Sequence, residues 1–122
     1  KGRAVKRYSI EQLKTLWKYA SPHQRVRMLI ALNFGFGAAE AASLELAEVF
    51  LHQPHPRSDE LGEVGKCPIG WVVRSRYKTA VYGEWKLWPV TATAIEWWLR
   101  QRAKIEIAEG VDTLLVTRTG QR

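Results

Sequence analysis

The chain has 122 residues, enough for one domain with its own core, and 46% of them are hydrophobic. Nineteen Lys and Arg against twelve Asp and Glu give a net charge of +7, which favours a polyanionic partner such as nucleic acid, although an ordinary solvated surface can carry the same charge. The single cysteine, Cys67, excludes an internal disulfide, and the longest uncharged stretch, residues 28–39, is too short to span a bilayer. We therefore expect a cytoplasmic domain without membrane contact.

Residues 1–8 are predicted to form a basic arm or linker, and residues 9–122 a domain. The arm carries Arg3, Lys6 and Arg7 besides Lys1, and no apolar period runs through it. These cations are candidates for contacts with DNA phosphates.

Two helices are predicted over residues 9–20 and 21–34, because each segment begins with a serine followed three residues later by a glutamine, a capping box. Gly35 is expected to end the second helix. The apolar residues recur at helical spacing, namely Ile10, Leu13, Leu16, Trp17 and Ala20 in the first helix and Val26, Leu29, Ile30 and Phe34 in the second.

A third helix is predicted from residue 38 to 51, which is rich in alanine and glutamate, followed by a proline-containing loop up to residue 68. Glu45 and Glu48 have the spacing of a solvated helix face. His52 and His55 have the spacing of metal ligands, but Pro54 separates them and no third ligand is apparent, so we expect no metal and no cofactor.

Residues 71–78 alternate as a strand, and a turn near residues 80–83 leads to a second strand that Pro89 ends. Arg74, Arg76 and Lys78 share one face of the first strand. Such a strip can follow a phosphate backbone, and the alternative is a solubilising edge strand.

A last helix is predicted over residues 91–107, capped by Thr91 or Thr93, followed by a short strand over residues 112–117 and a turn that contains Arg118. The expected fold class is therefore α+β and mostly helical, with three N-terminal helices, a small antiparallel hairpin, a helix and a strand. Phosphate-binding glycine loops and serine-nucleophile elbows are absent from the sequence.

The order of these motifs resembles the first part of the catalytic domain of tyrosine recombinases, the phage-integrase family. YSIEQLKTLW is similar to its opening helix, MLIALNFGFGAAEAASLELAEV to its first-arginine box, RSRYKTAVYGEWKLWPV to its lysine hairpin, and LLVTRTGQR to the strand before its second active-site box. The resemblance covers nearly the whole chain. It implies a partial recombinase fold, and double-stranded DNA as the partner.

Two departures from the family pattern concern catalysis. Gly37 stands where the family has the arginine that holds the scissile phosphate, a bidentate task that glycine cannot perform. The sequence also ends before the family's His-x-x-Arg box and tyrosine nucleophile, since Tyr8, Tyr19, Tyr77 and Tyr82 fall in the wrong part of the order.

Two site residues are carried over by the resemblance: Glu40 as an acid that supports the active-site frame, and Lys78 as the general acid for the leaving oxygen. The expectation is a DNA-binding fragment of a bacterial or phage-type recombinase, associated with the nucleoid, which does not cut DNA alone. It can form homo-oligomers or pair with the C-terminal half. The alternatives are a non-enzymatic module that kept the fold, with Trp88, Trp97 and Trp98 as a partner surface, and an unrelated α+β domain.

Overall fold

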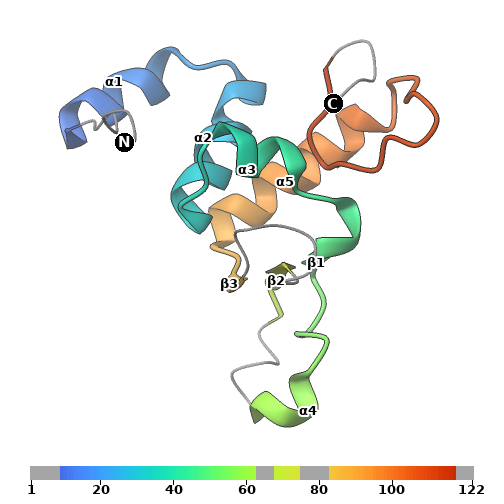
Figure 1. The fold of residues 1–122 in the computed structure, drawn as a ribbon. Helices are drawn as coiled ribbons and strands as arrows, with labels where there is room; N and C mark the ends of the chain where they lie inside the picture. Colours follow the sequence, from blue (N-terminus) through green and yellow to red (C-terminus); the bar gives the residue numbers. More distant parts are fainter. Residues whose placement is uncertain (1–8, 63–67, 75–82, 118–122) are drawn as a thin grey trace, which may run out of the picture.

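The computed structural model describes residues 9–62, 68–74 and 83–117, and within them the fold is α+β, as predicted (Figure 1). The elements in chain order are α1 (Ile10–Tyr19), α2 (Pro22–Phe34), α3 (Ala38–Ser43), the 3₁₀ turn η1 (Leu46–Glu48), β1 (Val49–Leu51), α4 (Ser58–Leu61), β2 (Gly70–Arg74), β3 (Gly83–Lys86) and α5 (Pro89–Arg102). Helices α2 and α5 pack against each other and lie over the sheet, whereas α1 lies to one side (Figure 1).

The predicted capping boxes of the first two helices are confirmed. Ser9 Oγ accepts a hydrogen bond from the Gln12 backbone N–H at 3.1 Å, and Gln12 Oε1 accepts one from Ser9 N at 2.8 Å. Ser21 and Gln24 repeat the arrangement at the same distances. Such caps each contribute about 0.5–2 kcal/mol, which explains why both boundaries are readable from local sequence.

The core lies between α2, α5 and the sheet. Its fully buried side chains are Val26, Ile30, Leu44, Val72, Ile95, Leu114 and Val116. Trp98 is also buried, and its indole Nε1 donates to Leu114 O at 2.7 Å. The expected partner surface containing Trp98 is therefore wrong for this residue, because its ring and its N–H are both used inside the domain.

The described strands form an antiparallel sheet in the order β1-β2-β3. Val72 pairs with Val49 on one side and with Trp85 on the other, so β2 is the central strand. Asn33 at the end of α2 joins β3 to α5, since its Nδ2 donates to Lys86 O at 3.0 Å and its Oδ1 accepts from Trp88 N at 2.8 Å.

The third helix is shorter than predicted. It ends at Ser43, and residues 46–51 form η1 and then strand β1. The helical propensity of the alanines and glutamates extends over residues 38–48, but Val49, Phe50 and Leu51 gain backbone partners in β2. Tertiary pairing therefore overrides the local preference.

Two boundaries near the C-terminal end also differ from the prediction. Strand β3 ends at Lys86, before Pro89, and Pro89 is the first residue of α5, where a missing N–H costs nothing. The N-cap is Trp88 instead of Thr91 or Thr93. Residues 112–117 form no strand, only a bridge between Thr113 and Glu45, although they supply buried side chains to the core.

We expect His23 to make the fold less stable in mild acid. Its ring lies 4.7 Å from that of Trp98, and burial, assisted by the nearby Arg27, lowers the pKa of its imidazole below 6.5. Below pH 6.5 the imidazole of the unfolded chain takes up a proton while that of the folded chain stays neutral. The stability that neutral His23 contributes is therefore fully present above pH 6.5 and is lost as pH falls through the pKa of the folded chain. The melting temperature of His23→Gln, measured between pH 5 and 7, should depend less on pH than that of the natural chain. Identical slopes would contradict the assignment.

Candidate functional site

The stretch that resembles the first-arginine box forms a turn anchored to the core by one aromatic ring. Gly35 ends α2 in the left-handed conformation, with φ of 69°. Phe36 is buried, and its ring centroid lies 5.4 Å from that of Phe34 and 5.2 Å from that of Trp85. The next residue, Gly37, is exposed. The turn therefore holds position 37 at the surface, next to the buried ring of Phe36.

Glu40 supports this turn from within α3. Its Oε1 accepts a hydrogen bond from Gly37 N at 2.7 Å, which satisfies a backbone donor at the start of the helix. Gly37 itself has φ of −80° and ψ of −175°, an extended conformation that any residue adopts. A Cβ at position 37 would lie 2.8 Å from Glu40 Oε1, the end of a flexible side chain that must then move.

Arg74 is not part of an exposed basic strip, contrary to the prediction. Only 3% of its surface is accessible, because the face of β2 that carries Val72 and Arg74 is turned towards α3 and η1. Its guanidinium donates to Glu48 Oε2 at 3.2 Å, to Glu40 O at 3.0 Å, and to both Ser43 O and Ser43 Oγ at 3.0 Å. Four of its five N–H donors are engaged inside the domain and the side chain is buried, which contradicts the predicted exposed phosphate contact of Arg74.

Glu48 is the acid that makes this burial possible. It is 4% exposed, its Oε1 accepts from Glu45 N at 2.9 Å, and its Oε2 faces Arg74. The expected solvated face is therefore wrong for Glu48. A buried carboxylate and a buried guanidinium that satisfy each other's charge form a stable pair, whereas either alone is costly.

Arg74 joins two segments that the sequence separates by about thirty residues. Through the Glu40 and Ser43 backbone oxygens it holds the end of α3, and its guanidinium carbon lies 5.4 Å from the Phe36 ring centroid. The base of the hairpin is thereby fixed to the box around Gly37. Arg3, Lys6, Arg7, Arg76, Lys78 and Arg118, the other predicted contacts, lie outside the described residues.

The positive charge is concentrated outside the described part of the chain. Segments 1–8, 63–67, 75–82 and 118–122 carry nine of the nineteen Lys and Arg but only one of the twelve acidic residues, Glu63. The described residues carry the remaining ten basic and eleven acidic side chains, so they are close to neutral. The basic excess therefore belongs to the segments that were predicted to contact DNA.

The two histidines of the loop after β1 serve as structural ties. His52 Nε2 lies 2.5 Å from Glu96 Oε2 on α5, and His55 Nε2 lies 2.6 Å from Glu84 Oε1 on β3. The Nδ1 of His55 accepts from Arg57 N at 2.9 Å, whereas its buried Nε2 makes only the close contact with Glu84, without hydrogen-bond geometry. Across residues 9–62, 68–74 and 83–117 no group of three or more His, Cys, Asp or Glu side chains is placed to hold a metal ion.

No family model, no curated protein and no solved structure matches the chain. Among the described helices, none is long and apolar enough to cross a membrane. The functional conclusion therefore rests on the residues and their geometry.

Proposed function

We propose that this chain is a DNA-binding part of an integrase-like tyrosine recombinase, which serves site-specific DNA recombination and integration in the intact parent. Residues 1–122 hold double-stranded DNA and do not cut it. The observation that carries the proposal is the clustering of basic residues along the sequence: residues 1–8 carry four Lys or Arg, residues 75–82 two and residues 118–122 two, and none of these three segments contains an acidic residue.

The geometry around Gly37 supports a recombinase-like frame. The Glu40 carboxylate accepts from the backbone N–H of position 37. Arg74, at the base of the hairpin, donates to the backbone oxygen of Glu40. Arg74 therefore holds the end of β2 against the segment that follows position 37.

The same geometry explains why we assign no cleavage to these residues. Position 37 offers no guanidinium, and Arg74 has its donors engaged by Glu48, Glu40 and Ser43. Arg25 is engaged as well, with its Nε donating to Trp17 O at 3.0 Å. Without a clamp on the phosphate, a general acid such as Lys78 gives no useful rate.

The second candidate function is a non-enzymatic module that kept the fold and binds DNA or a protein. Gly37 favours it, since the loss of the phosphate-binding residue leaves the frame intact. Of the proposed aromatic partner surface, Trp88 is exposed, Trp97 is half-buried and Trp98 belongs to the core.

The experiment that tests DNA binding by the hairpin compares Arg76→Ala and Lys78→Ala with the natural chain. Each substitution is expected to weaken binding of a fluorescent duplex whatever its sequence. The slope of the logarithm of the binding constant against the logarithm of the salt concentration should fall by about one in magnitude, the contribution of one phosphate contact. Lys104→Ala, an exposed cation after α5, is the matched control. If neither hairpin variant weakens binding relative to Lys104→Ala, the hairpin is not the contact.

Gly37→Arg is expected to fold with a loss of about 0.5–2 kcal/mol in unfolding free energy, because position 37 is exposed and extended but a Cβ there displaces the Glu40 carboxylate that caps α3. We also expect it to bind duplex DNA more tightly than Ala38→Arg, which adds the same charge one residue away, and to release no cleaved product. The two affinities, measured side by side with urea unfolding, check this. Equal affinities would remove position 37 from the DNA interface.

A further inference from the structure

Helix α1 is amphipathic, yet none of its residues is buried. Its apolar residues remain accessible, with exposed fractions of 66% for Ile10, 44% for Leu16 and 76% for Tyr19. Leu32, on the outer side of α2, is 47% exposed. An apolar surface of this kind on neighbouring helices is typical of a site for a partner.

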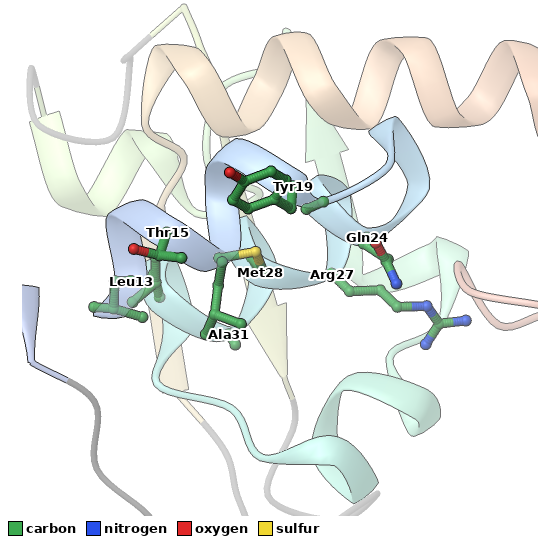
Figure 2. Close-up of a pocket in the computed structure, with 10 residues that line it drawn as sticks. Leu13, Thr15, Tyr19, Gln24, Arg27, Met28 and Ala31 are labelled. Atoms are coloured by element: carbon green, nitrogen blue, oxygen red, sulfur yellow. The ribbon is translucent and has the colours of Figure 1, made fainter. Parts of the chain in front are cut away.

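The two helices enclose a groove of about 710 Å³. The lining residues are Leu13, Thr15, Leu16, Tyr19, Ala20, Gln24, Arg27, Met28, Ala31 and Leu32. Figure 2 shows Met28 and Ala31 in the middle of this set, Leu13 and Thr15 at one end, and Gln24 and Arg27 at the other. The groove therefore has an apolar middle, a mixed end at Leu13 and Thr15, and a polar end at Gln24 and Arg27.

The walls of the groove are held in place by Arg25. Its Nε donates to Trp17 O at 3.0 Å and its Nη2 to Lys18 O at 3.4 Å, at the last turn of α1. The guanidinium carbon also lies 4.9 Å from the centroid of the Trp17 ring. Because α1 is tied to α2 in this way, the groove is preformed and a ligand need not order it.

The charges around the groove are unequal. Arg27 lines one end, and Lys18 Nζ lies 5.4 Å from the centroid of the Tyr19 ring, which forms part of the wall. Among the described residues that line the groove there is no Asp or Glu. Glu11 lines a neighbouring hollow with Thr15 and Leu16, towards the opposite end of α1.

We propose that this groove binds an amphipathic helix of a partner protein, with an apolar stripe that enters between α1 and α2 and acidic residues that face Arg27 and Lys18. Helix-in-groove recognition uses anchors at the i, i+3, i+4 and i+7 positions, and two helical walls with an apolar floor fit such a stripe. The charge of the rim selects acidic flanks. This binding is independent of the proposed DNA contacts.

The same observations disfavour other occupants. A flat membrane surface leaves a concave floor unfilled, and DNA phosphates make no favourable contact with the apolar middle formed by Met28 and Ala31. Helix α1 of a second copy exposes an apolar face, but it carries Lys14 and Lys18, which have the same charge as the rim. An acidic helix is the occupant that satisfies both the shape and the charge.

The test uses a fluorescein-labelled peptide of about four helical turns, with leucines at the i, i+3, i+4 and i+7 positions and glutamates on the remaining face. We expect saturable binding, and an affinity lowered about tenfold or more by Ala31→Glu, which places a charge in the groove. Val90→Glu, at an exposed apolar residue outside the groove, is the matched control and should bind normally. Circular dichroism checks that each variant folds.

Reversing the charge of the rim gives a second measurement. Arg27→Glu should weaken binding of the glutamate peptide and strengthen binding of the same peptide with lysines in place of glutamates. The proposal is overturned if a scrambled peptide binds equally well or if Ala31→Glu has no effect. It is also overturned if the chain instead self-associates through this face or if anionic vesicles or duplex DNA displace the peptide competitively.

Discussion

Arg74→Ala is expected to lower the free energy of unfolding by about 3–5 kcal/mol. The substitution leaves the Glu48 carboxylate buried without its partner and removes the donor from Glu40 O and Ser43 O. Urea unfolding followed by tryptophan fluorescence measures the loss. Arg74→Lys should recover only part of it, because an ammonium cannot reproduce the planar set of donors.

Arg57→Ala is the matched control. Arg57 pairs with Glu84 on the surface, with a side chain that is more than half exposed, and a pair of this kind contributes about 0–1 kcal/mol. A small loss of stability in Arg74→Ala, combined with a clear loss of DNA affinity, would contradict the structural role and would restore Arg74 to the DNA interface.

Gly70→Ala is expected to destabilise the sheet by about 2–6 kcal/mol. Gly70 has φ of 125°, which costs another residue about 1–3 kcal/mol, and a Cβ there would lie 2.4 Å from Phe50 O and 3.0 Å from His52 N, an overlap that costs about 1–3 kcal/mol more. Both neighbours are backbone atoms of the adjoining strand region, so neither can rotate away.

Gly35→Ala is the comparison for this substitution. Gly35 has φ of 69° but no atom within 4 Å of a Cβ, so only the conformational cost of about 1–2 kcal/mol applies. The same unfolding measurement should rank Gly70→Ala well above Gly35→Ala. Equal losses would mean that β1 and β2 do not approach each other as closely as described.

The parts of the fold that are encoded locally could be predicted from the sequence. The boundaries of α1 and α2 follow from the Ser9 and Ser21 capping boxes, and the end of α2 follows from Gly35. Strand β1 could not be predicted, because its three residues are extended only through pairing with β2. The start of α5 at Pro89 was missed because the proline was interpreted only as the end of a strand, whereas proline is also favoured at the first position of a helix.

The internal connections of the candidate site could not be predicted from the sequence. Alternation along β2 correctly places Val72 and Arg74 on one face, but periodicity does not tell which face is buried. The arginine is buried because Glu48, twenty-six residues earlier, supplies a buried carboxylate. Glu45 and Glu48 both lie among apolar residues in LELAEVF, and nothing in that spacing tells which of the two is buried.

The most direct test of the central claim is a titration of the natural chain against duplex DNA at several salt concentrations. With Arg3, Lys6, Arg7, Arg76, Lys78 and Arg118 as the contacts, the logarithm of the binding constant should fall linearly with the logarithm of the salt concentration, with a slope approaching about −5. The account predicts this binding without any cleaved product. Absence of binding even at low salt would contradict it.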